Sequence, residues 1–143
     1  MTEVSADARS FLERPLVATI ATLGHDGAPR TAPIWFQWAP GPSGEGAAYL
    51  FTSRGTLKWR NIERDPRVSL CVDDRELPYR SVLIDGVAVE DTQRDLFELV
   101  SELALAYYGP DKGPPFADGY RGDRPNVVVF RIDPTRVTTY LED

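Results

Sequence analysis

The stretch YLFTSRGTLKWRNIERDP brings together residue types that can bind an anion. Three hydroxyl residues and two cations stand where a strand-like pattern gives way to a helix-like one, namely Thr52, Ser53, Arg54, Thr56 and Lys58. Backbone N–H groups at the start of a helix lack intrahelical partners and lie at the positive end of the helix dipole, so they attract anions. We therefore expect this turn to hold a phosphate. An ordinary strand-to-helix connection with exposed cations is the alternative.

Lysine is rare in this chain, which makes the lysine of the turn informative. Lys58 and Lys112 are the two lysines among 16 lysine and arginine residues. Trp35 and Trp59 add a second signal, because an aromatic residue near an anion site suits a ligand with a planar ring and a phosphate tail. Packing in the core or at an interface is the alternative interpretation of both tryptophans.

Other catalytic chemistries have little support in the sequence. The single histidine, His25, falls in a predicted hairpin turn, and the chain has no G-x-S-x-G motif, which argues against a serine triad. The single cysteine, Cys71, lies within an apolar strand pattern and is interpreted as a buried, inert thiol. Carboxylate pairs at residues 73–74 and 90–91 lie at strand ends, where a solvated loop explains them. One cysteine and one histidine also exclude an intrachain disulfide and a cysteine- or histidine-rich metal site.

Composition and charge favour a single globular domain in the cytoplasm. The 143 residues are enough for one domain with a hydrophobic core, and 42% of them are hydrophobic. The net charge of −6 argues against binding to nucleic acid, which requires a basic face. No apolar run is long enough to span a membrane, and the first residues lack the pattern of a secretory signal.

Hydrophobic periodicity predicts the elements that must position the turn. Short turns join most of the strands, which is typical of an antiparallel barrel, so we expect an α+β fold, mainly β, in a single domain over residues 1–143. We expect helices over residues 5–13 and 56–64, a helix from a capping box at residues 92–95 to residue 108, strands over residues 16–23, 28–38, 47–52, 66–72, 79–90 and 125–141, and a long loop over residues 109–124.

Two of these strands carry features of their own. Alternation within residues 28–38 places Ile34 and Phe36 on a face that can fill a barrel, and Trp35 on the opposite face, which suits a ligand or a subunit interface. Gly86 lies in the middle of a long strand and predicts a bulge or a close approach of two backbones.

Three segments, in this order and spacing, resemble one protein family over almost the whole chain. They are VATIATLGHDGAPRTAPIWFQW, YLFTSRGTLKWRNIERDPRVSLCVDD and YRSVLIDGVAVED. They resemble the flavin- and deazaflavin-binding split β-barrel proteins related to pyridoxamine phosphate oxidase, and within these the small proteins that use coenzyme F420, a deazaflavin. The most specific part is the run T-S-R-G-T-x-K-x-R-N, followed by DPRVSL.

This resemblance implies a split antiparallel β-barrel with short flanking helices, which forms a homodimer with two cofactors, coenzyme F420 or FMN, in clefts between the subunits. The turn would hold the cofactor phosphate, a strand would border the ring system through its backbone, and a loop would reach the partner's site. Carried over residue by residue, the phosphate end is Thr52, Ser53, Arg54, Thr56, Lys58 and Asn61, the ring strand is Thr31, Ala32, Pro33, Ile34 and Trp35, and the loop residues are Tyr79 and Arg80.

The resemblance also implies a function. The expected protein is an oxidoreductase that transfers a hydride between the deazaflavin and a small organic substrate, and the sequence identifies no catalytic side chain for it. The alternatives are an FMN-dependent oxidoreductase, a non-catalytic flavin, deazaflavin or tetrapyrrole carrier, and a dimer that binds a simple anion.

Two details refine this expectation. The C-terminal sequence RVTTYLED lacks the arginine and histidine pattern with which the parent oxidase recognises its vitamin substrate, so vitamin B6 oxidation is not expected. Arg60 and Arg64 follow the turn and could meet the anionic tail of F420, and a solvated helix face explains them equally well.

Overall fold

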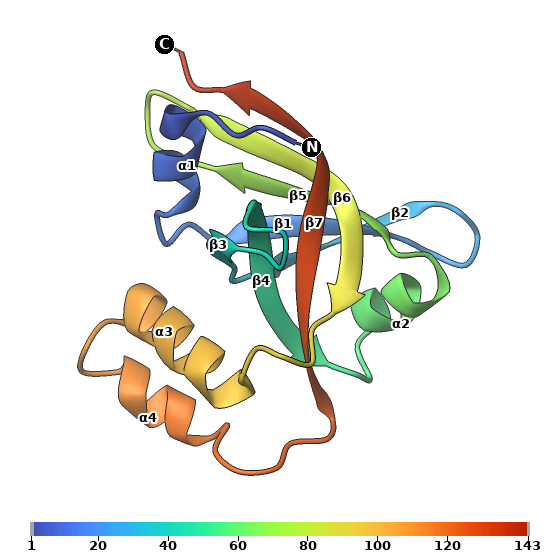
Figure 1. Cartoon of the computed structure of the whole chain (residues 1–143), viewed down its shortest axis with the longest axis vertical. Coiled ribbons are helices and arrows are strands. Elements are labelled where there is room, and N and C mark those ends of the chain that lie inside the picture. Colours follow the sequence, from blue (N-terminus) through green and yellow to red (C-terminus); the bar gives the residue numbers. More distant parts are fainter. Residues whose placement is uncertain (1, 143) are drawn as a thin grey trace.

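The computed structural model describes residues 2–142, which form one curled antiparallel sheet with four helices around it (Figure 1). Within these residues seven strands follow the order β2-β1-β5-β6-β7-β4-β3, and all neighbouring strands are antiparallel. The fold is therefore α+β and mainly β, a split antiparallel β-barrel with short flanking helices, as the sequence predicts. The elements are α1 (Ala6–Leu12), β1 (Ala18–Leu23), β2 (Pro29–Ile34), β3 (Gln37–Pro40), β4 (Gly46–Ser53), α2 (Leu57–Arg64), β5 (Arg67–Asp73), β6 (Ser81–Glu90), α3 (Leu96–Tyr108), α4 (Gly113–Asp118) and β7 (Val127–Tyr140).

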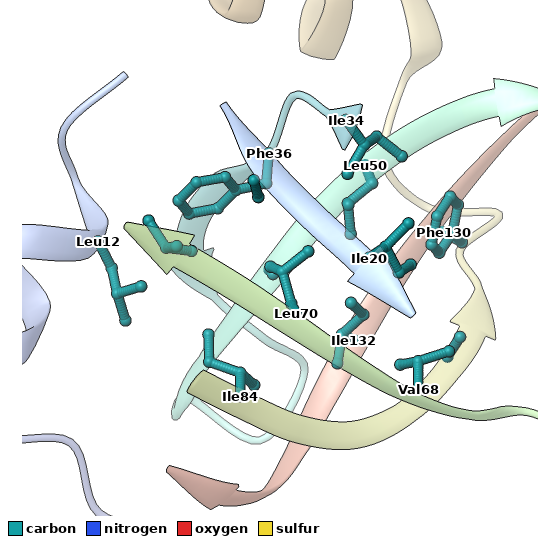
Figure 2. Packing of buried hydrophobic residues seen from close by; sticks show 14 of the residues in the cluster. Leu12, Ile20, Ile34, Phe36, Leu50, Val68, Leu70, Ile84, Phe130 and Ile132 are labelled. Atoms are coloured by element: carbon teal, nitrogen blue, oxygen red, sulfur yellow. The ribbon is translucent and has the colours of Figure 1, made fainter. Parts of the chain in front are cut away.

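One face of the curled sheet encloses the main hydrophobic core. In β1, β5 and β6 buried residues alternate with half-exposed ones, because successive side chains of a strand point to opposite faces. The buried members converge inside the barrel, where Figure 2 shows Ile20, Leu70, Ile84, Phe130 and Ile132 gathered and neighbouring one another. Burial of one such side chain stabilises the fold by about 1.5–3 kcal/mol.

The longest ladder joins β6 to β7 and contains the bulge that Gly86 predicts. The register shifts between Asp85 and Gly86, and Gly86 then pairs with Pro134. A side chain at Gly86 would collide with the carbonyl oxygen of Asp133, so the two backbones approach closely only because this residue is glycine. The prediction of a bulge with a close backbone approach is confirmed.

The prediction of one strand over residues 28–38 is wrong, because the chain changes partners in the middle. β2 pairs with β1, whereas β3 pairs with β4, so the two strands form opposite edges of the sheet. At the break the N–H of Phe36 donates to the hydroxyl of Tyr107 at 3.3 Å, and that hydroxyl donates to the carbonyl of Leu16 at 2.8 Å. A side chain from α3 therefore satisfies backbone groups that a continuous strand would have paired.

The start of α3 also differs from the prediction. Asp95, rather than Thr92, caps the helix, and its carboxylate accepts the N–H of Glu98 at 2.9 Å. The preceding residues form a turn around Asp91, whose carboxylate accepts the N–H groups of Gln93 and Arg94 at 2.8 and 2.9 Å. This turn satisfies the backbone that a helix starting at Thr92 would have used.

The expected long loop over residues 109–124 contains a helix, α4. Proline at its start is compatible with a first helical turn, where backbone N–H groups have no intrahelical partner. A side chain at Gly113 would lie 2.8 Å from the carbonyl oxygen of Ala104, so this glycine lets α4 pack closely on α3. The prolines and glycines that suggest a loop are thus the residues that place a short helix.

Candidate functional site

The two halves of the sheet differ in what covers their outward faces. Four consecutive residues of β4, at positions 47–50, are buried, so both faces of this strand are covered. Leu99 and Leu103 of α3 pack on it, in a cluster with Tyr49 and Val129. In β1, β5 and β6 the outward side chains stay half-exposed along the strands. One outward half of the sheet is therefore covered by α3, and the half next to β2 is open.

The expected turn lies between β4 and α2, as the sequence predicts, and a short chain of hydroxyl groups fixes its shape. The hydroxyl of Thr56 accepts the N–H of Trp59 at 3.3 Å and so caps α2, and it donates to the carbonyl of Ser53 at 2.8 Å. The hydroxyl of Thr52 lies 3.3 Å from that of Thr56. The exposed Ser53 and the half-buried Thr56 thus lie at the N-terminus of α2, where an anion is favoured.

Lys58 carries the available charge of this turn. Within residues 2–142 its ammonium group makes no ion pair and no hydrogen bond, although the side chain is half-buried. Burial lowers the pKa of Lys58 below its ordinary value, because an ammonium group loses hydration without gaining a partner. A partly buried cation of this kind can gain energy from an anionic ligand.

Arg54, expected beside Lys58, is engaged within the chain. Its guanidinium donates to both carboxylate oxygens of Glu90, at 3.1 and 2.6 Å, and to the carbonyl of Pro125 at 3.1 Å. Its backbone N–H donates to the carbonyl of Asn126 at 2.7 Å. Arg54 therefore ties the turn to the end of β6 and to the segment before β7, and this role was not visible in the sequence.

Asn61 is directed at the barrel. Its side-chain amide donates to the hydroxyl of Thr22 at 3.0 Å, and its carbonyl oxygen accepts from Arg64 at 2.8 Å. Arg64 also donates to the carbonyl of Leu23 at 3.0 Å, so both residues fasten α2 to β1. Arg60 donates back to the carbonyl of Gly55 at 3.0 Å and remains exposed beside the turn.

The expected ring strand, residues 31–35, lies at an edge of the sheet. β2 pairs only with β1, so half of its backbone groups face away from the ladder. Thr31 and Pro33 are exposed, Ala32 is half-buried and Ile34 is buried in the core. An edge strand with small exposed side chains can offer its backbone to a flat ligand.

A groove of about 350 Å³ lies against the end of this strand. Trp35 lines this groove, and its ring stacks on that of Tyr107 with centroids 4.8 Å apart and an angle of 9° between the planes. Phe116 lies 5.4 Å from Trp35, between centroids. The residues that line the groove are all uncharged, and they are Val17, Pro33, Ile34, Trp35, Phe51, Tyr108 and Phe116.

Tyr79 and Arg80 lie away from the turn within one chain. They belong to the loop between β5 and β6, which lies beside α1, whereas α2 lies at the other side of the barrel (Figure 1). Tyr79 is 69% exposed, and Arg80 lines a separate pocket with Arg14. A single chain therefore brings together the turn residues, and separately the ring strand and the groove, but not the loop residues.

Trp59 and His25 agree with their structural interpretations, whereas Cys71, which we expected to be buried, is only half-buried. Trp59 is buried in the core with its ring 5.4 Å from that of Phe130. His25 is exposed in the hairpin turn, and Cys71 is half-buried, where burial raises the pKa of its thiol. Among residues 2–142 no three histidine, cysteine or acidic residues are placed to hold a metal ion, and no helix is long and apolar enough to cross a membrane.

The fold is that of a split β-barrel protein, and its turn places a half-buried lysine near the start of a helix. The model of the pyridoxamine 5'-phosphate oxidase family matches residues 4–141. The chain therefore belongs to this family.

Solved structures agree with this family. A structure described as an F420 reductase is 30% identical, with a TM-score of 0.71, over 94% of this chain and 98% of that chain. The conserved hypothetical protein Rv2991 from Mycobacterium tuberculosis is 26% identical, with a TM-score of 0.74, over 96% of this chain and 84% of that chain. The heme storage protein HutZ from Vibrio cholerae, 18% identical over 97% of this chain and 94% of that chain, has a TM-score of 0.66 and shows the fold alone. No curated protein sequence matches the chain significantly.

Proposed function

We propose that this protein is a deazaflavin-dependent oxidoreductase that transfers a hydride between coenzyme F420 and a small organic substrate. The observation that carries the proposal is the half-buried ammonium group of Lys58 at the start of α2, which has no partner within residues 2–142. The likeness to an F420 reductase, at 30% identity over nearly the full length of both chains, supports the choice of cofactor.

In this proposal, residues of the turn and of β2 bind the cofactor and orient its ring system. Lys58 and the N-terminus of α2 hold the phosphate, and the hydroxyl groups of Ser53 and Thr56 lie beside it. The free edge of β2 borders the ring system, and the uncharged groove next to Trp35 adjoins this edge. When bound, the deazaflavin supplies the hydride, so the site needs no protein acid or base for that transfer.

A second copy of the chain completes the proposed site. The open half of the sheet presents half-exposed side chains from β1, β5 and β6, and such a surface is suited to a subunit interface. In the homodimer, Tyr79 and Arg80 of one protomer would approach the cofactor of its partner. We place this dimer in the cytoplasm.

FMN is the alternative cofactor, because it also ends in a phosphate and would meet the same lysine. The test is a titration of the purified protein with F420 and with FMN, side by side, followed by ligand fluorescence. We expect saturable binding of F420 at micromolar concentration and weaker binding of FMN. Tighter binding of FMN would replace the deazaflavin by a flavin in the proposal, and no binding of either would refute both.

A turnover assay distinguishes an enzyme from a protein that only carries the cofactor. With reduced F420 bound, a panel of conjugated small molecules should accelerate the oxidation of the cofactor. A protein that binds the cofactor but oxidises it no faster with any member of the panel would be a carrier.

A further inference from the structure

We propose that the groove between β2, α3 and α4 is the substrate subsite, and that it selects a flat, uncharged, conjugated molecule of two or three rings. The proposal rests on the proposed function, because the groove adjoins the strand that borders the cofactor ring. Tyr108 and Phe116 are the residues that we infer to determine specificity.

The lining of the groove argues for an uncharged occupant. All seven lining residues are uncharged, and four of them are aromatic, Trp35, Phe51, Tyr108 and Phe116. A charged ligand would lose its hydration here without meeting an opposite charge. Lys58 differs in this respect, because its ammonium group has no partner within residues 2–142 and can receive an anion, whereas the groove offers no charged group.

The geometry of the rings argues for a flat occupant. The stack of Trp35 on Tyr107 and the contacts of Phe116 with Trp35, Tyr108 and Tyr120, at 5.2 to 5.6 Å between centroids, hold the aromatic wall in place. Rigid rings favour offset or edge contacts with another ring. The volume of about 350 Å³ lies within the range of small-molecule sites.

The exposed rim of the groove leaves apolar surface and hydrogen-bond donors unused. Val17 is 50% exposed and Tyr108 is 47% exposed, so an apolar occupant would remove both from water. Within residues 2–142 neither the hydroxyl of Tyr108 nor the indole N–H of Trp35 makes a hydrogen bond. Both donors belong to residues that line the groove, so a carbonyl group on the occupant is a compatible partner.

The test uses two probes that share a naphthalene ring, the neutral ketone 2-acetylnaphthalene and the anion 2-naphthoate. Their binding to the protein without cofactor is measured by isothermal titration calorimetry. We expect the ketone to bind and the naphthoate to bind at least about tenfold more weakly, since the latter must lose its hydration. Equal binding of both probes, or no saturable binding of the ketone, would overturn the proposal.

Three variants locate the binding. Phe116→Leu keeps an apolar side chain but removes the ring, and should weaken ketone binding by about tenfold. Val17→Lys changes an exposed residue, so the protein should fold normally while the preference shifts from the ketone toward the naphthoate. Tyr140→Ala, an exposed aromatic residue outside the groove, should change neither affinity. Unchanged affinities in Phe116→Leu and Val17→Lys, with normal melting temperatures, would show that the probe binds elsewhere and would contradict the proposal.

Two further measurements distinguish the subsite from a subunit contact and from the cofactor site. If a second copy of the chain occupied the groove, probe binding would disappear as the protein concentration rises, and the subsite would be refuted. If the ketone binds as expected but neither F420 nor FMN does, the proposed function falls and the groove remains a site for planar molecules. If the cofactor binds and the ketone does not, the proposed function stands and the subsite is wrong.

Discussion

The turn before α2 and the groove beside α3 are built in opposite ways. The turn is polar and local: its shape comes from hydroxyl groups within residues 52–59, and it leaves one cation without a partner among residues 2–142. The groove is apolar and assembled from distant segments, and its aromatic wall combines Trp35, Phe51 and Phe116. The turn suits the charged phosphate of the proposed cofactor, and the groove suits the flat, uncharged substrate that we propose beside the ring system.

The largest expected effect is on the free energy of unfolding, and it comes from the buried ion pair next to α3, the helix beside the groove. Asp91 is buried and accepts from the guanidinium of Arg131 at 3.2 Å, and it also forms the turn that starts α3. Asp91→Ala removes a buried carboxylate that balances the positive charge of Arg131. It should lower the free energy of unfolding by about 3–5 kcal/mol, measured with urea.

Asp133, which pairs with the same arginine, provides a matched control. Asp133 also pairs with Arg131, at 2.9 Å, but its side chain is 43% exposed, so Asp133→Ala should cost about 1 kcal/mol or less. Equal losses for Asp91→Ala and Asp133→Ala would show that the buried pair does not secure α3 as we describe.

Lys58→Ala should have the next largest effect, and on binding rather than on folding. Loss of a charge-assisted contact should weaken F420 binding by about 1.5–3 kcal/mol, measured by titration calorimetry. The melting temperature should not fall, because the ammonium group has no partner within residues 2–142. Lys112→Ala, which removes the other lysine at an exposed position, is the control and should bind normally. Normal binding by a Lys58→Ala protein that melts early would make the turn a structural feature.

Thr56→Ala should have a smaller effect on the turn and none on the groove. It removes the cap of α2, which should lower the free energy of unfolding by about 1 kcal/mol, while Thr56→Ser keeps the hydroxyl and should lose less. Binding of 2-acetylnaphthalene should stay unchanged in both variants. A change in that binding would mean that the two regions are coupled.

The pH dependence of cofactor binding is the most subtle expected effect. Burial lowers the pKa of Lys58 in the free protein, and a bound phosphate should raise it again. Binding then favours the protonated lysine, so affinity should be constant below the pKa of the free protein and fall as pH rises through it. The fall should begin below about pH 10.4, the ordinary value for lysine. Lys58→Arg should remove it, and the same profile in both proteins would assign the fall to another group.

The local features of the turn could be predicted from the sequence. A strand, a hydroxyl residue at the start of a helix and a rare lysine are visible within a few residues, and the cap at Thr56 and the helix α2 follow them. The bulge at Gly86 was visible for the same reason, since a glycine in the interior of a long strand typically marks a bulge or a close backbone approach. The engagement of Arg54 was not visible, because its partner Glu90 lies 36 residues away in the chain.

The groove could not be predicted from the sequence, because two segments that contribute residues to it were predicted incorrectly. These are the single strand over residues 28–38 and the loop over residues 109–124. The apolar alternation continues through Trp35 and Phe36, so nothing local indicates that the chain leaves one edge of the sheet for the other there. The hydroxyl of Tyr107 that satisfies this break comes from a distant helix. Phe116 lies in a segment whose prolines and glycines indicate a loop, although they form α4.

The most direct test of the central claim is a binding cycle between Lys58 and the cofactor phosphate. Titration calorimetry would compare the cofactor that binds more tightly with the same ring system lacking its phosphate, in the unaltered protein and in Lys58→Ala. We predict that loss of the phosphate weakens binding strongly in the unaltered protein and little in Lys58→Ala, with a coupling free energy of about 1.5–3 kcal/mol. Equal losses in the two proteins would show that the phosphate is held elsewhere.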